Sequence, residues 1–105
     1  MGLRNKVLEA DSLHELLDIV DIVYVTRLQR ERFADQVDYE RLKGKFVIDR
    51  KLLSQLSDVP FILHPLPRNE EIHPDVDDMP CAKYVYQMYC GLLMSQAIIS
   101  KVCGE

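Results

Sequence analysis

The stretch Ile22-Val23-Tyr24-Val25 decides the fold class of this chain. It is a continuous β-branched and aromatic run, which is typical of a strand buried on both faces of a parallel sheet. Residues 12–20 precede it as a short amphipathic helix, with Ser12 as a good N-cap and Glu15 in the capping-box position three residues later. We therefore expect a helix that leads directly into a buried strand.

The same alternation continues along the chain. Residues 37–43 favour a short helix ended by Gly44, and Lys45 to Asp49 indicate a second strand. Another brief helix is expected over 50–56, followed by a third strand from Val59 to Leu63. Strands that alternate with short helices predict βαβ units with right-handed crossovers. The fold class is therefore α/β, a parallel sheet with flanking helices.

From Pro80 onward the sequence predicts one long helix with a break near Gly91. Apolar residues lie almost all the way round it, so it requires cover on every side. Its uncharged part, Tyr84 to Ser100, contains polar residues and is shorter than the roughly 20 apolar residues that span a bilayer. We expect a buried helix and no membrane span.

The composition is that of one folded domain, residues 1–105, without internal repeat or linker. Of the 105 residues, 48% are hydrophobic and 29% are charged, unlike the composition of disordered chains. The formal charge of −4 offers no broad basic face, which argues against nucleic acid as a partner. The N-terminus lacks the apolar run of a signal peptide, and the three cysteines lack CxxC spacing, so reduced thiols and a cytoplasmic location are expected.

The polar segment 26–32 follows the first predicted strand, where ligands of open parallel sheets bind. Arg27 and Gln29 are two residues apart, which in an extended chain places both side chains on one side. A guanidinium beside an amide suits a carboxylate ligand. Two alternatives stay open: Arg27 is a surface charge at a strand end, and the residues from Arg30 to Arg32 form a solvated loop or an interdomain contact.

The segment His64-Pro65-Leu66-Pro67-Arg68 is a more specific signal. Consecutive X-Pro bonds after a buried strand fix an unusual backbone and are able to hold a cis peptide. Such a backbone would expose carbonyls to the amide NH2 of a ligand. A rigid strand-exit turn without a ligand explains the prolines equally well, and His64 would then be an ordinary turn histidine.

Metal and nucleophile chemistry find little support. His73, Asp75, Asp77 and Asp78 are metal-ligating types, but their position beside Pro74 and before a helix favours a solvated acidic cap. There is no glycine-rich phosphate loop and no family-like Ser-His-Asp or Cys-His order. We expect no metal, and no catalytic nucleophile on this chain.

Two long motifs, in order, resemble the second half of aspartate carbamoyltransferase. They are Asp21-Ile-Val-Tyr-Val-Thr-Arg-Leu-Gln-Arg-Glu-Arg-Phe33 and Leu63-His-Pro-Leu-Pro-Arg-Asn-Glu-Glu-Ile72. The likeness continues through Val76-Asp-Asp and Tyr84 to Gly91, and it covers nearly the whole chain from about Leu8 onward. The sister family, ornithine carbamoyltransferase, typically has Cys where Pro65 stands here. Pro65 therefore favours aspartate as the acceptor.

The resemblance implies the C-terminal, aspartate-binding part of a Rossmann-like carbamoyltransferase fold. The implied reaction is attack by the amino group of L-aspartate on carbamoyl phosphate in pyrimidine synthesis, with no cofactor. By the family pattern, Arg27 would bind an aspartate carboxylate with the help of Gln29. The carbamoyl phosphate side would be formed by Pro65, Leu66 and Pro67, through backbone carbonyls and a cis Leu66–Pro67 peptide.

Four further residues have supporting roles by the same resemblance. Glu31 and Arg32 would make contacts when two domains close, and His64 and Arg68 would support the second loop. The family's N-terminal carbamoyl-phosphate domain, with its Ser-Thr-Arg-Thr segment, has no counterpart in these 105 residues. The resemblance implies that the parent enzyme is a homotrimer. Because the carbamoyl-phosphate pocket would lie on the other domain, the aspartate domain is expected to be inactive alone.

Several positions depart from the family pattern. Ser95 stands where members usually carry Arg, and Cys81 and Met88-Tyr-Cys replace residues that are smaller or more polar. These replacements motivate an alternative function, a pseudoenzyme or assembly module within a pyrimidine-pathway complex.

Overall fold

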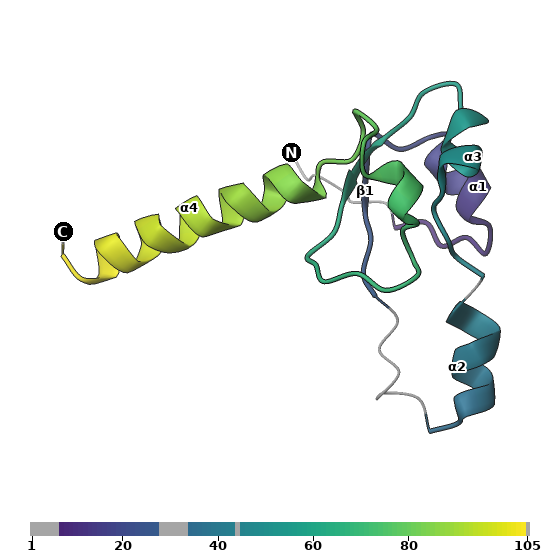
Figure 1. Cartoon of the computed structure of the whole chain (residues 1–105), viewed down its shortest axis with the longest axis horizontal. Helices are drawn as coiled ribbons and strands as arrows, with labels where there is room; N and C mark the ends of the chain where they lie inside the picture. Colours follow the sequence, from purple (N-terminus) through teal and green to yellow (C-terminus); the bar gives the residue numbers. More distant parts are fainter. Residues whose placement is uncertain (1–6, 28–33, 44, 105) are drawn as a thin grey trace.

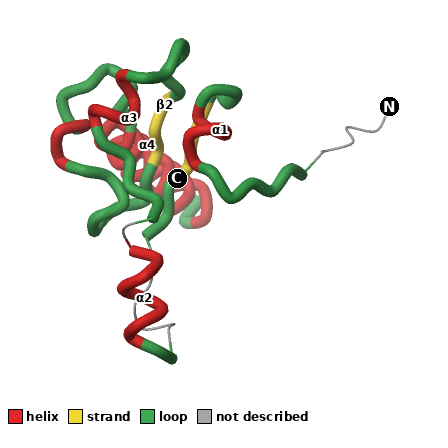
Figure 2. Tube along the Cα trace, turned by 90° about the vertical axis from the view of Figure 1, so that its right-hand side faces the viewer, coloured by secondary structure: helices red, strands yellow, loops and turns green. Residues whose placement is uncertain are grey.

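The computed structural model describes residues 7–27, 34–43 and 45–104. In chain order the elements are α1 (Leu13–Leu17), β1 (Ile22–Tyr24), α2 (Gln36–Lys43), α3 (Arg50–Ser54), β2 (Phe61–Leu63), the 3₁₀ helix η2 (Pro74–Val76) and α4 (Tyr84–Val102). The elements α1, β1, α3, β2 and η2 form a small body, from which α2 and the long α4 project in different directions (Figure 1). Figure 2 looks along α4 and shows α1 and α3 on opposite sides of β2 in that view.

The two strands pair in parallel, which confirms the predicted α/β class. Val23 lies opposite Ile62, with Ile22 opposite Phe61 and Tyr24 opposite Leu63. On its other edge β2 bonds the segment before α4, because Ile62 N donates to Cys81 O at 2.8 Å and Lys83 N donates to Ile62 O at 3.0 Å. The strand β2 is therefore enclosed on both edges.

The predicted strand over residues 45–49 is wrong. Only Ile48 bonds to a neighbour there, as an isolated parallel bridge to Ile72. The chain leaves the extended direction at once because the carboxylate of Asp49 accepts a hydrogen bond from Leu52 N at 2.8 Å and caps α3. A side chain that caps a helix ends the preceding ladder after one residue.

The sheet is covered on one face rather than two. Ile62 is fully buried and Val23 half-buried on the core side, whereas the alternate residues Ile22, Tyr24 and Phe61 are 56%, 57% and 52% exposed. Side chains alternate between the faces of a strand, so these exposures place one apolar face outward. The expectation that Ile22 to Val25 is buried on both faces is wrong for the described chain.

The core of the body gathers one or two apolar side chains from each short element. It consists of Leu17, Ile48, Leu53, Leu56, Ile62, Ile72, Val76, Cys81 and Tyr84. Because none of the body elements is longer than five residues, tertiary packing rather than helix or strand propensity stabilises them. The sheet edge described below is fixed to this core through Ile62 and Ile72.

The predicted short helices are present with different ends. The helix α2 agrees with the predicted helix over 37–43 within one residue, and Gly44 lies outside the described residues. The helix α1 is shorter than the predicted 12–20, and Ser12 makes no side-chain capping bond, so the capping box is wrong. Without that cap, the burial of Leu17 is what anchors α1 to the body.

The helix α4 is continuous over 19 residues, and only Tyr84 of its first turn is buried. The predicted break at Gly91 is wrong: a Cβ there would meet nothing within 4 Å, so no packing partner bends the helix. Large apolar side chains are exposed along it, namely Val85, Tyr86, Met88, Tyr89, Leu92, Leu93, Met94, Ile98, Ile99 and Val102. The expected burial of this helix is therefore not provided by the described residues.

Among the residues that the structure describes, no helix is long and apolar enough to cross a membrane.

Large apolar side chains are exposed along α4. Because exposed apolar patches associate in water, we expect the 105-residue chain to self-associate as its concentration rises. Leu92 and Ile99 are seven residues apart on one face and are 57% and 63% exposed. Replacing both with Lys should shift the chain toward monomer in analytical ultracentrifugation. Val37→Lys on α2, at an apolar residue that is 70% exposed, is the matched control and should change nothing. A monomer at every concentration would contradict the prediction.

Candidate functional site

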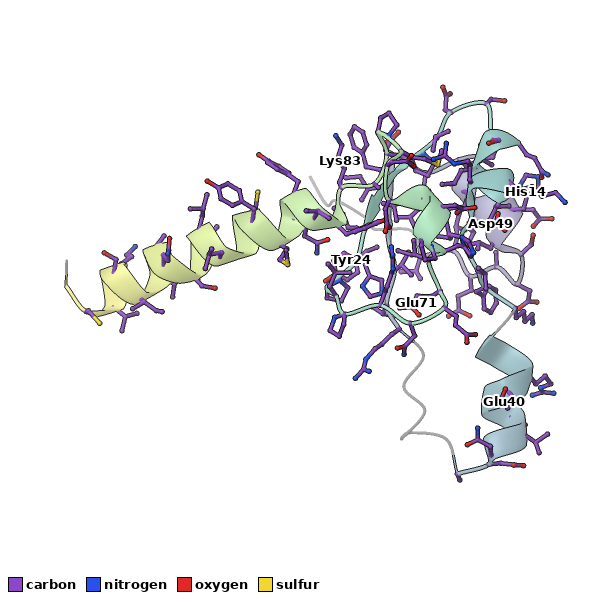
Figure 3. The ribbon with its side chains drawn as sticks, viewed as in Figure 1. His14, Tyr24, Glu40, Asp49, Glu71 and Lys83 are labelled. Atoms are coloured by element: carbon purple, nitrogen blue, oxygen red, sulfur yellow. The ribbon has the colours of Figure 1, made fainter. Side chains whose placement is uncertain are left out.

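The carboxyl ends of β1 and β2 lie at the same end of the sheet because the strands are parallel; we call this end the sheet edge. Val25 N donates to Leu63 O at 2.9 Å, which extends the pairing past the end of β1. The segment that continues to Arg27 and the loop that starts at His64 therefore leave the sheet side by side. We call residues 64–71 the sheet-edge loop; Figure 3 labels Tyr24, the last residue of β1, and Glu71, the last residue of this loop.

Of the first predicted segment, the structure places Arg27 at this edge. Arg27 is exposed and stands three residues beyond the end of β1. Gln29, Glu31 and Arg32 lie outside the described residues, so the roles expected of them stay predictions. The edge thus presents at least one guanidinium to solvent beside the sheet-edge loop.

The backbone of the sheet-edge loop has the expected form. The Leu66–Pro67 peptide is cis, and Leu66 has φ 50°. This value lies in the left-handed region, which a leucine rarely adopts because its Cβ is crowded there. Pro65 and Pro67 are exposed, and Leu66 is half-buried against the core.

The backbone nitrogen of His64 and both of its ring nitrogens make contacts. Its backbone N donates to Gln87 Oε1 at 2.8 Å, and its ring Nδ1 lies 2.8 Å from Leu66 N. Its Nε2 lies 2.6 Å from Glu71 Oε1. Among the described residues, His64 is the one polar residue that is buried.

Glu71 closes the sheet-edge loop from its far end. Its Oε1 also accepts a hydrogen bond from Asn69 N at 3.0 Å. Burial acts to raise the pKa of the Glu71 carboxyl, but hydrogen bonds from the backbone amides of Asn69 and Glu71 and from the His64 ring outweigh it and lower that pKa. The carboxylate is therefore charged at neutral pH.

Arg68 fixes the middle of the sheet-edge loop to the end of η2, through Asp77, and to the first turn of α4, through Tyr84. Its Nη2 donates to Asp77 Oδ2 at 2.7 Å, its Nη1 also contacts Asp77, and Nη1 lies 3.2 Å from the Tyr84 hydroxyl, which donates to Asp77. The hydrogen bonds from Arg68 lower the pKa of Asp77 to about 2. Burial, followed by the hydrogen bond to Asp77, raises the pKa of Tyr84 to about 12.

Asp77 and Asp78 are ion-paired with arginines, and the N-cap of α4 is Lys83, so the predicted acidic cap before this helix is wrong. Arg50 donates from its backbone N to Asp75 Oδ1 at 3.1 Å and pairs with Asp78 through its guanidinium. These contacts hold η2 against the start of α3. Among the described residues, no group of three or more His, Cys, Asp or Glu side chains is placed to hold a metal ion.

The residues expected to depart from the family pattern lie outside the sheet-edge loop. Ser95 is exposed, and its hydroxyl donates to Gly91 O at 2.9 Å within α4. The Cys81 side chain is buried in the core, and this burial raises the pKa of its thiol. All three cysteines are free.

Besides Glu71 within the sheet-edge loop, sequence reasoning missed three residues that contact the loop from outside it, Asp77, Tyr84 and Gln87. Each contacts the sheet-edge loop across nine to 23 residues of sequence. Neither periodicity nor local spacing relates residues that far apart. The packing of α4 against β2 brings Tyr84 and Gln87 to the loop, and the end of η2 brings Asp77 there.

Known proteins share the sequence and the fold of this chain. Residues 4–102 match the family model "Aspartate/ornithine carbamoyltransferase, Asp/Orn binding domain". The aspartate carbamoyltransferase catalytic subunit of Thermoplasma acidophilum is 40% identical over 105 residues, which cover 100% of this chain and 34% of that subunit. The chain thus spans about a third of the length of the curated relatives that it matches.

Solved structures agree. The catalytic subunit of M. jannaschii aspartate transcarbamoylase superposes with a TM-score of 0.75 at 46% identity, over 86% of this chain and 29% of that chain. The Trypanosoma cruzi aspartate transcarbamoylase solved with N-(phosphonacetyl)-L-aspartic acid has a TM-score of 0.71 at 37% identity, over 82% of this chain and 27% of that chain.

The Arg68–Asp77 pair predicts a specific acid sensitivity of the folded chain. Folding lowers the pKa of Asp77 from 3.8 to about 2, so the pair contributes stability that is complete above pH 3.8 and is lost as the pH falls toward 2. Asp77→Asn should be less stable than the unsubstituted chain at neutral pH and should lose less stability over that acidic interval. Urea unfolding followed by circular dichroism measures both.

Asp58→Asn, at an exposed carboxylate, is the control and should keep the full acid dependence. An Asp77→Asn variant with an unchanged acid profile would contradict the prediction.

Proposed function

Because the chain belongs to the aspartate/ornithine carbamoyltransferase family, we propose that it is the L-aspartate-binding part of an aspartate carbamoyltransferase. The amino group of L-aspartate attacks the carbonyl carbon of carbamoyl phosphate, and N-carbamoyl-L-aspartate and phosphate are formed. The observation that carries the proposal is the sheet edge, where Arg27 and the sheet-edge loop leave two parallel strands side by side. The names of the relatives favour aspartate over ornithine as the acceptor.

On the amino-acid side, Arg27 binds a carboxylate of L-aspartate through its guanidinium, and Gln29 assists it. A guanidinium presents a planar fork of N–H donors that matches a carboxylate in two parallel hydrogen bonds. The exposure of Arg27 at the strand end supports this role. No cofactor and no metal are needed for the reaction.

On the carbamoyl side, the backbone carbonyls of Pro65 and Leu66 accept hydrogen bonds from the carbamoyl NH2, beside the cis Leu66–Pro67 peptide. Backbone carbonyls suit an amide only if they are held in place before the ligand arrives, since catalysis by positioning depends on fixed geometry. The contacts of His64 and Arg68 fix this loop at its start and its middle. His64 and Arg68 are thus loop supports, while Glu31 and Arg32 make contacts on domain closure.

The complete enzyme carries a carbamoyl-phosphate domain in addition to this chain, assembles as a homotrimer and works in the cytoplasm in pyrimidine synthesis. The partial coverage of the relatives supports the first of these statements. The exposed apolar face of the sheet and the exposed surface of α4 also fit a chain that packs against further protein.

A second candidate function is an assembly module without activity. Ser95 favours it, because its hydroxyl is bonded within α4 and does not replace a guanidinium. Under this alternative a Ser95→Arg substitution would restore transfer to an otherwise inactive protein.

The test is a graft in which residues 4–102 of this chain replace the matching third of the Thermoplasma acidophilum catalytic subunit. The graft should carbamoylate L-aspartate, and Arg27→Ala should raise the KM for aspartate by roughly tenfold or more, because a lost charge-assisted hydrogen bond is worth about 1.5–3 kcal/mol. The KM for carbamoyl phosphate should change much less. Steady-state assays with each substrate varied in turn measure both constants.

Arg41→Ala on α2 removes a guanidinium whose side chain is 74% exposed and is the matched control; it should leave both constants unchanged. A folded graft that transfers nothing, or that accepts ornithine instead of aspartate, would contradict the proposal. Inactivity relieved by Ser95→Arg would favour the assembly module.

A further inference from the structure

The ring of His64 lies between the two arms of the sheet-edge loop. Its side chain is 0% exposed, and that of Glu71 is 11% exposed. Leu66 belongs to the arm that leaves β2, and Glu71 to the arm that returns to the body. A buried polar ring must satisfy both nitrogens, and His64 does so with one partner from each arm.

These partners determine which ring nitrogen carries the proton. The backbone N–H of Leu66 is only a donor, so Nδ1, at 2.8 Å, must be unprotonated and accept. The proton is then on Nε2, which donates to the Glu71 carboxylate at 2.6 Å. The contacts therefore fix His64 as its Nε2–H tautomer.

The hydrogen bond to Nδ1 also sets the direction of a carbonyl. The Pro65 carbonyl and the Leu66 N–H belong to one planar trans peptide unit and point in opposite directions. Holding the Leu66 N–H against His64 thus directs the Pro65 carbonyl away from the ring. The left-handed φ of 50° at Leu66 makes such a restraint necessary, because a leucine left alone favours other conformations.

The Leu63–His64 peptide unit, two units before the Pro65–Leu66 unit, is also held by hydrogen bonds. The Leu63 carbonyl accepts from Val25 N of the neighbouring chain segment at 2.9 Å, and the His64 N–H donates to Gln87 of α4 at 2.8 Å. The strand pairing and α4 therefore fix this unit from opposite sides. Rotation of the His64 residue would break its backbone hydrogen bond to Gln87 or a ring contact to Leu66 or Glu71.

We propose that His64 is a positioning residue that aims the Pro65 carbonyl at the carbamoyl group through Nδ1, and that Glu71 and Gln87 hold it for this task. The inference rests on the proposed function and adds the atom through which His64 acts and the residues that support it.

The chain contains a matched control. His73-Pro74-Asp75 repeats the arrangement, with His73 Nδ1 accepting from Asp75 N at 3.2 Å. That ring is 58% exposed and its Nδ1 also lies 3.1 Å from Asp75 Oδ1, so its contacts fix no tautomer. It lies at the start of η2, outside the sheet-edge loop.

Two substitutions at His64 test the contacts of its two ring nitrogens separately, because each keeps one contact and removes the other. In His64→Asn, the amide oxygen reaches the N–H two residues on, as Nδ1 does, but the side chain is too short for Glu71. In His64→Gln, the longer side chain reaches toward Glu71 and leaves the Leu66 N–H without its acceptor. In the graft, His64→Gln should raise the KM for carbamoyl phosphate about tenfold and His64→Asn less than about threefold, with the KM for aspartate nearly constant.

His73→Asn and His73→Gln should leave both constants unchanged. Equal effects of the two His64 substitutions would overturn the inference, because a histidine that served stability alone would respond to both alike.

An independent measurement uses the 105-residue chain and does not depend on activity. Long-range ¹H–¹⁵N correlation spectra report which nitrogen of His64 is protonated, and Nε2 is expected. Protonation at Nδ1 would overturn the inference. The proposed function fails if the unsubstituted graft transfers nothing. The His64 contact to Leu66 still stands in that case if His64 shows the Nε2–H tautomer and the Leu66 amide exchanges faster in His64→Gln than in His64→Asn. An active graft without that tautomer and without that difference in exchange would remove the positioning role and leave the function.

Discussion

The central position of β2 is the constraint on which the rest of this structure depends. Its backbone bonds β1 on one edge and the segment before α4 on the other, with Ile62 buried in the core. Because β1 and β2 are parallel, Arg27 and the sheet-edge loop both follow the carboxyl ends of the strands. The pairing of β2 with the segment before α4 brings the first turn of α4 to that loop. A strand of three residues has little stability of its own, so this arrangement exists because both edges and one face are occupied.

The sequence-based predictions succeed where one local signal is unopposed and fail where two compete. The apolar run Phe61-Ile62-Leu63 followed by two prolines predicts a strand and its sharp end, and both are present. Residues 45–49 also read as a strand, but Asp49 is a strong N-cap, and the helix α3 takes over from the ladder. Gly91 is a helix breaker only by propensity, and propensity is weak where nothing nearby favours a bend.

The candidate site shows the same division. The sheet-edge loop and Arg27 could be located from strand ends and prolines, because those signals are local. The partners that fix the loop could not be, since Gln87 and Tyr84 reach it only through the fold of α4 on β2. Burial of Tyr84 at the start of α4 beside exposure of the remaining helix was equally invisible, because an all-round apolar helix does not say which of its residues are covered.

The two sides of the proposed site obey different physical rules. Under the proposal, the exposed guanidinium of Arg27 makes the contact on the carboxylate side, so its removal is expected to act directly and on one substrate. On the carbamoyl side the proposed ligand contacts are backbone atoms, which no substitution deletes. The loop that carries them is held by side chains behind it, with His64 between Glu71 and the Leu66 amide. Substitutions there act by releasing a peptide unit rather than by removing a contact, and for that reason the choice between Asn and Gln at one position is more informative than a deletion of the ring.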